Sequence, residues 1–108
     1  MKKREVVLSP EARADLLALY DWIAEAASPE IAVGYVERLE TYVRSFDVAS
    51  ERGRARDDIR QGLRITGFKR RVTVVFTVTD TKVTILRLFY GGQDWGSALG
   101  EDADFNNK

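Results

Sequence analysis

The chain of 108 residues contains no cysteine and no histidine. Without cysteine it has no disulfide framework and no thiolate ligand for a metal, so nothing in the composition points to an oxidising compartment. Without histidine it lacks the side chain best suited to proton transfer near neutral pH, which is also the commonest zinc ligand. Most hydrolytic mechanisms lose a usual participant, and we expect neither a metal nor a cofactor.

Long apolar runs are also missing, and no segment approaches the length needed to span a membrane. The first eight residues have a basic tip and then an apolar run of three residues, shorter than the apolar region of a signal peptide. We therefore expect a cytoplasmic protein. With 44% apolar and 31% charged residues, the chain matches one ordinary globular domain built on a single core.

The net charge is zero, but the charges are unevenly distributed. Residues 52–90 hold 10 Lys/Arg and 3 Asp/Glu, whereas residues 1–51 hold 6 and 10, and residues 91–108 hold 1 and 4. A basic middle is thus flanked by acidic ends. This asymmetry is compatible with a nucleic-acid surface, with a site for an acidic protein segment, or with a solvated basic face, which is the commonest outcome.

Proline occurs twice, each time after a serine. Each Ser-Pro pair predicts a helix start, because serine caps a helix and proline suits the first helical position. The first pair follows a β-branched run at residues 5–8 and begins an amphipathic helix over about residues 10–27; the second begins a further helix that forms an antiparallel hairpin with the first. The predicted inward stripes are Ala12, Leu16, Leu19, Tyr20, Ile23 and Ala27 in the first helix, and Ile31, Tyr35, Leu39, Tyr42 and Phe46, widened by Val36 and Val43, in the second.

Three β-rich segments follow a polar, arginine-rich connection over residues 49–62. Strands are predicted to begin at residue 63, to run over residues 71–78, and to run over residues 83–90, joined by short turns into a meander. The order β-α-α-β-β-β predicts an α+β fold, with an N-terminal strand and a helical hairpin packed on a small, mainly antiparallel sheet. We expect residues 1–95 to form one domain and residues 96–108 to form an acidic, flexible tail.

The last strand is apolar on both sides, which predicts a second apolar sheet face that a partner covers. We expect Val75, Ile85 and Phe89 to contact that partner. Three arginines beside them are expected to receive its acidic side chains, with Trp95 as a further anchor; they are Arg64, Arg71 and Arg87. Three alternatives remain: the tail covers this face, Arg87 pairs within its own chain, or the partner binds the helical hairpin around Leu17, Tyr20 and Trp22.

No motif with a chemical mechanism is present: no phosphate-binding loop, no HExxH and no nucleophile elbow. Asp57 and Asp58 form an adjacent carboxylate pair within an arginine-rich stretch. Local ion pairing is favoured there over metal binding, because sites for hard cations gather several convergent oxygen ligands.

A series of short blocks resembles the ParE branch of the RelE/ParE toxin superfamily over about residues 5–95. The blocks are residues 8–16 (LSPEARADL), 20–25 (YDWIAE), 52–54 (RGR), 57–64 (DDIRQGLR), 71–80, 83–88 and Gly91. The resemblance implies a type II toxin that is not an enzyme and that poisons DNA gyrase by binding it. It also implies a ParD-like antitoxin with a ribbon-helix-helix N-terminus, no membrane partner and no sequence-specific nucleic-acid binding.

The chain departs from ParE-like sequences at Tyr90, where a histidine often precedes the glycine. RelE-like relatives cleave mRNA on the ribosome, and Arg87 with Tyr90 imitates part of their basic cluster. However, unperturbed Tyr and Arg do not titrate near neutral pH, and the neutral total charge contrasts with the positive excess that tight RNA binding needs. The gyrase poison is therefore favoured over the ribonuclease, and a non-toxic relative that only binds antitoxin is the third possibility.

Overall fold

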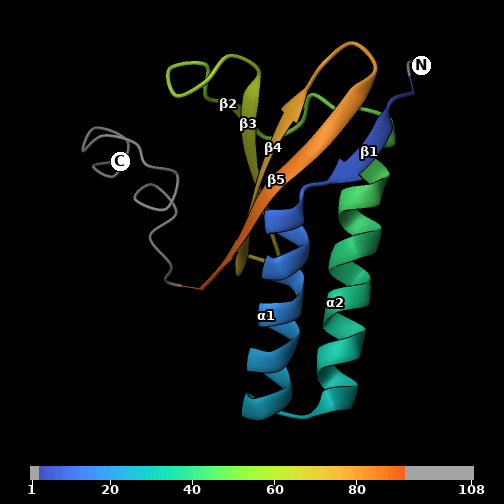
Figure 1. Cartoon of the computed structure of the whole chain (residues 1–108), viewed down its shortest axis with the longest axis vertical. Helices are drawn as coiled ribbons and strands as arrows, with labels where there is room; N and C mark the ends of the chain where they lie inside the picture. Colours follow the sequence, from blue (N-terminus) through green and yellow to red (C-terminus); the bar gives the residue numbers. More distant parts are fainter. Residues whose placement is uncertain (1–2, 92–108) are drawn as a thin grey trace.

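The computed structural model describes residues 3–91. The elements are β1 (Glu5–Leu8), α1 (Pro10–Ala26), α2 (Pro29–Arg44), the 3-10 turn η1 (Ser45–Asp47), β2 (Arg54–Ala55), β3 (Leu63–Phe68), β4 (Val72–Val78) and β5 (Lys82–Tyr90). The predicted α+β fold is confirmed, since the α1–α2 hairpin packs on a sheet of order β1-β5-β4-β3-β2 (Figure 1). Only the β1–β5 pair is parallel among these strands. Trp95 and the tail of residues 96–108 lie outside the described residues.

Both predicted helix starts are confirmed. The Ser9 hydroxyl accepts a hydrogen bond from the Ala12 N–H at 3.0 Å, and the Ser28 hydroxyl accepts one from the Ile31 N–H at 3.1 Å. Ser9 also donates to the carbonyl of Leu86 at 2.8 Å. The residue that caps α1 therefore also ties the start of α1 to β5, just where β1 ends.

The main core lies between the helical hairpin and the sheet. Leu39, Val43 and Phe46 meet Phe76 there, and all four side chains are fully buried. Two stripe residues were predicted wrongly. Ala27 is exposed, because α1 ends at Ala26, and Ile31 is 55% exposed while its neighbour Ala32 is buried instead. The inward stripe of α2 passes through residues 32, 35, 39 and 43, one position away from Ile31.

An irregularity in β5 changes which side chains face the helices. The β4–β5 register shifts between Val75, which pairs with Arg87, and Phe76, which pairs with Ile85, so that Leu86 is an extra residue. An extra residue inverts the alternation of side chains along a strand. Ile85 consequently belongs to the helix-facing core, and the prediction that it shares a face with Phe89 is wrong.

The second sheet face carries a smaller apolar cluster of Leu63, Ile65, Val75 and Phe89. Ile59, from the connection between β2 and β3, and Leu86 pack against it. Val75 is 0% exposed and Phe89 is 3% exposed. The prediction that these side chains form an open docking face is therefore wrong for this structure, because neither presents surface to a partner.

The predicted polar connection contains β2, a two-residue strand that pairs with β3 at the edge of the sheet. Predicted ion pairing is confirmed here, since the Arg56 guanidinium donates to both oxygens of Asp58 at 2.9 and 2.7 Å. Asp57 accepts a hydrogen bond from the Gly62 N–H at 2.8 Å. Both carboxylates thus organise the connection. Within residues 3–91, no helix is both long and apolar enough to cross a bilayer.

Candidate protein-binding site

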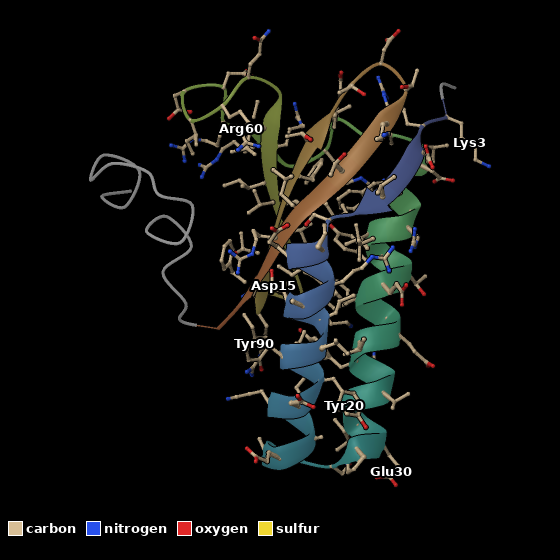
Figure 2. All side chains as sticks on the ribbon, viewed as in Figure 1. Lys3, Asp15, Tyr20, Glu30, Arg60 and Tyr90 are labelled. Atoms are coloured by element: carbon tan, nitrogen blue, oxygen red, sulfur yellow. The ribbon has the colours of Figure 1, made fainter. Side chains whose placement is uncertain are left out.

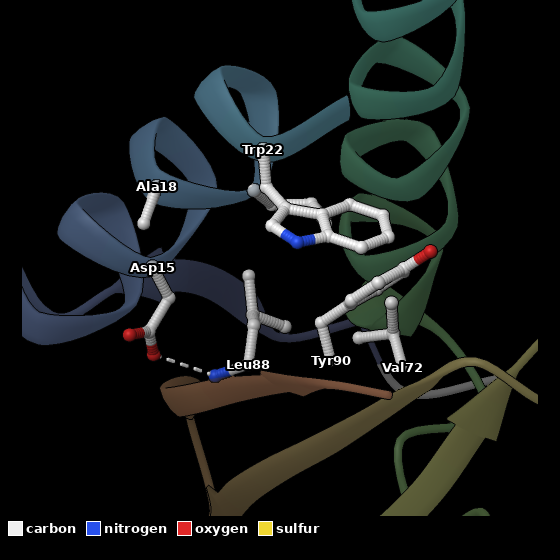
Figure 3. A pocket seen from close by; sticks show the side chains of 7 residues that line it. Asp15, Ala18, Trp22, Val72, Leu88 and Tyr90 are labelled. Atoms are coloured by element: carbon white, nitrogen blue, oxygen red, sulfur yellow. Dashed lines mark hydrogen bonds between the residues drawn. The ribbon is translucent and has the colours of Figure 1, made fainter. Parts of the chain in front are cut away.

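A pocket of about 250 Å³ lies between α1 and the last residues of β5 (Figure 3). It is lined by Asp15, Ala18, Leu19, Trp22, Val72, Leu88 and Tyr90. The pocket exists because pairing between β1 and β5 stops at Leu8 and Ile85, while β5 continues to Tyr90. On that edge of β5, α1 rather than a strand lies beside the last residues, while β4 pairs with the other edge.

Aromatic rings form one wall of this pocket. Trp22 packs against Tyr90 with ring centroids 4.7 Å apart, and Tyr90 meets Tyr35 edge-on at 6.5 Å. Trp22 nevertheless remains 53% exposed, and Leu17 on the same helix is 69% exposed. Large apolar groups held partly in solvent by a rigid helix are typical anchors of protein–protein contacts.

The opposite wall is fixed by an ion pair between α1 and β5. Arg87 donates to the two carboxylate oxygens of Asp15 at 2.8 and 3.0 Å, and the Leu88 N–H donates to Asp15 at 2.8 Å. The hydrogen bonds that Arg87 donates to Asp15 raise the pKa of Arg87, while partial burial acts in the other direction. Arg87 also lies over the ring of Phe89, with its guanidinium carbon 4.6 Å from the ring centroid.

The three arginines predicted to receive a partner's carboxylates differ in whether their guanidinium groups already have partners in this structure. Arg87 is paired within its own chain, as the alternative interpretation held. Arg64 donates to the carbonyls of Arg52 at 2.9 Å and Glu51 at 3.2 Å. Arg71 is exposed. The structure therefore leaves Arg71 as the available cation of the three.

The alternative binding surface on the helical hairpin was predicted at Leu17, Tyr20 and Trp22, and these three residues differ in exposure. Leu17 and Trp22 are exposed on α1, whereas Tyr20 packs partly against the main core. Asp15 was not predicted as a site residue, because it lies off the apolar stripe and its partner is 72 positions away. No local sequence signal marks such a pair. Ala18 is a small residue one helical turn before Trp22, and it leaves space in the pocket lining. Its size was the weak sequence signal for a pocket at this position.

Tyr35 carries an unusual hydroxyl. Its oxygen is buried and has no hydrogen-bond partner among the described residues. Burial, followed by the nearby Tyr90, raises the pKa of Tyr35, although Arg71 and Arg38 act in the other direction. The hydroxyl therefore stays protonated near neutral pH and does not serve there as a general base.

Comparisons with known proteins agree with this architecture. A sequence model described as the ParE toxin of the type II toxin–antitoxin system parDE matches residues 6–95. A solved structure entitled "Chromosomal ParDE TA system from P. aeruginosa" is similar, with a TM-score of 0.72 and 24% identity, over 82% of this chain and 97% of that chain. No curated protein matches. The family match extends over most of the chain, and the structural likeness shows a shared fold.

Proposed function

Because the chain belongs to the family of ParE toxins of type II toxin–antitoxin systems, we propose that it poisons DNA gyrase by binding it. A ParD-like antitoxin, with a ribbon-helix-helix N-terminus and an amphipathic C-terminal segment, neutralises it. Both interactions take place in the cytoplasm, where gyrase works. The chain acts as a binding protein, and none of its side chains carries out catalysis.

The ion pair between Arg87 and Asp15 is the observation that best supports a binding protein over a catalyst. A ribonuclease of the RelE type would need Arg87 and Tyr90 to converge on a substrate phosphate. Both guanidinium contacts of Arg87 instead go to one carboxylate, and the ring of Tyr90 packs on Trp22. A guanidinium already held by two charge-assisted hydrogen bonds is costly to release, which disfavours its use on a transient substrate.

The pocket between α1 and β5 is the proposed seat of the antitoxin. Trp22 lines the pocket, and Leu17 extends the apolar surface of α1. The volume of about 250 Å³ holds one large apolar side chain from the antitoxin. Full burial of such a side chain contributes about 1.5–3 kcal/mol, enough for a principal anchor of the complex. The exposed Arg71 is then available to an acidic antitoxin residue.

Induction of the chain in bacteria tests the choice of target. Poisoned gyrase leaves cleaved DNA, so cells should filament and mount a DNA-damage response while mRNA stays intact. With purified gyrase, the chain should raise the amount of cleaved DNA, and the antitoxin should suppress that rise. Ribosome-dependent mRNA cleavage that is abolished by Tyr90→Phe would contradict the proposal and establish the ribonuclease instead.

The non-toxic relative gives a third, separate result. In that case the purified chain binds the antitoxin, yet induction leaves growth unchanged and gyrase cleaves no additional DNA. Assays of antitoxin binding and gyrase poisoning on one preparation therefore separate loss of toxicity from loss of folding.

A further inference from the structure

A basic groove lies along the sheet edge formed by β2 and β3. Figure 1 shows this edge on the opposite side of the sheet from β1. The groove is open, has a volume of about 410 Å³, and is lined by Gly53, Arg54, Ile65, Thr66, Gly67 and Thr73. The turn of Lys69, Arg70 and Arg71 follows directly. We call these lining residues and this turn together the basic groove. No carboxylate of residues 3–91 lines it.

Strand register places the cations at the two ends of the groove. Arg54 pairs with Ile65 across β2 and β3, and Gly67 pairs with Thr73 across β3 and β4. Gly67 lies two residues beyond Ile65, about 7 Å along the strand. The turn at Lys69 begins two residues further on. Arg54 and the turn therefore flank a floor with little side-chain bulk.

Among the described residues, no acidic side chain compensates the charge of the groove. Between Asp58 and Asp80 the chain has no Asp or Glu, but it has five Lys/Arg. Arg54 and the three cations of the turn are exposed. None of these four forms an ion pair with any other residue in the range 3–91. By contrast, Arg56 in the neighbouring connection is held by Asp58.

The backbone of the turn is strained, because two residues that carry a Cβ adopt positive φ angles. Lys69 has φ 51° and Arg70 has φ 61°, both in the left-handed region, and the Arg71 N–H donates to the Phe68 carbonyl at 3.0 Å. Positive φ angles at the two central residues of a hairpin turn favour Asn-Gly. Lys-Arg at these positions makes the turn less stable than Asn-Gly would. Strained backbone of this kind is concentrated at functional sites.

We infer that the basic groove binds the phosphodiester backbone of a nucleic acid without reading its sequence. Phosphates are commonly contacted by arginine, lysine, hydroxyl and backbone N–H groups, and the groove offers guanidinium, ammonium and threonine hydroxyl groups beside glycine backbone. An acidic peptide would also need apolar anchor pockets, and Ile65, the apolar residue of the lining, is only 8% exposed. This inference shares Arg71 with the proposed antitoxin seat, but it does not rest on that proposal, because Arg54, Lys69 and Arg70 take no part in it.

Fluorescence anisotropy with the full chain tests the inference on two nucleic-acid probes, a short mixed-sequence DNA duplex and a single-stranded RNA of the same sequence. A polyglutamate peptide is the acidic comparison probe. If four cations contact phosphates, the logarithm of the duplex binding constant should fall with the logarithm of salt concentration with a slope of about −3.6. The Lys69→Asn/Arg70→Gly variant removes two cations, so its slope should be shallower by about 1.8. Asn-Gly suits the turn, so thermal unfolding should show equal or greater stability.

The matched control is Arg13→Gln/Arg38→Gln, which removes two exposed cations from the helices and changes the net charge equally. Its slope should match that of the unaltered chain. An equal loss in both variants would overturn the inference, because it would show a net-charge effect. Binding to neither probe would also overturn it, as would binding only to a polyglutamate peptide, which would assign an acidic protein partner. Binding to DNA, to RNA or to both supports it and identifies the source.

Discussion

Asp15 of α1 accepts three hydrogen bonds from β5: two from the Arg87 guanidinium, at 2.8 and 3.0 Å, and one from the Leu88 N–H at 2.8 Å. The carboxylate takes the place of a strand neighbour, since the pairing of β1 with β5 ends before Leu88. Figure 2 shows Asp15 on the side of α1 that lies beside β5. The contact fixes the separation of the two elements, and with it the width of the pocket that Trp22 lines.

Replacement of this carboxylate should destabilise the chain. Asp15→Ala leaves a partly buried guanidinium and a backbone N–H without their acceptor, and we expect a loss of about 2 kcal/mol in the free energy of unfolding, measured by urea denaturation. Asp21→Ala, an exposed position on the same helix, is the control and should change stability by less than about 0.5 kcal/mol. Similar losses in both variants would show that the ion pair contributes nothing specific.

The proposed antitoxin seat predicts which apolar residues matter for binding. Trp22→Ala should weaken antitoxin binding by about 2 kcal/mol, measured by titration calorimetry on folded protein. Ile31→Ala is the matched control, because Ile31 is 55% exposed, close to the 53% of Trp22, but lies on α2 away from the pocket lining. Ile31→Ala should bind normally. Equal losses, or no loss for Trp22→Ala, would place the antitoxin elsewhere.

Phe89→Ala should act on folding, in contrast to Trp22→Ala. Phe89 is 3% exposed within the second cluster, so its truncation should cost roughly 3–5 kcal/mol of stability. Affinity for the antitoxin should remain normal at temperatures where the variant stays folded. If Phe89→Ala lost antitoxin affinity while its stability stayed unchanged, the second sheet face would be the antitoxin-binding surface.

Tyr35→Phe should preserve or raise stability, because it removes a buried hydroxyl that has no hydrogen-bond partner among the described residues. The raised pKa of Tyr35 also predicts a pH dependence. The folded state holds this proton more tightly than the unfolded state, so the contribution of Tyr35 is present below its ordinary pKa of about 10 and is lost as pH rises through the higher folded value. Unfolding curves at neutral and alkaline pH should show a smaller alkaline loss for Tyr35→Phe than for the unaltered chain.

The sequence predicted the features that depend on neighbouring residues. Ser9 and Ser28 predict both helix starts, because the hydroxyl of each caps an N–H group only three residues further along the chain. The face occupied by Ile85 could not be predicted, since the irregularity at Leu86 depends on pairing with β4 and inverts a two-residue period. The role of Asp15 was hidden for a related reason, because its partner lies on a strand far along the chain.

The β2–β3 contact supports a last prediction, on the glycine that makes it possible. Gly53 has φ 73°, and a Cβ at this position would lie 2.2 Å from the Ile65 carbonyl oxygen and 2.8 Å from the Thr66 Cβ. Gly91 has a similar φ of 64°, but a Cβ there would meet no atom of the described residues within 4 Å. Gly91→Ala therefore carries only the left-handed backbone cost of about 1–2 kcal/mol, whereas Gly53→Ala adds a clash with backbone atoms and should cost roughly 2–4 kcal/mol. Urea unfolding of the two variants separates the contributions. Because the clash pushes β2 from β3, hydrogen exchange should also accelerate at the Arg56 N–H, which donates to the Leu63 carbonyl at 2.7 Å. Equal destabilisation by both substitutions, with unchanged exchange at Arg56, would show that the close approach of Gly53 to β3 is relieved without cost.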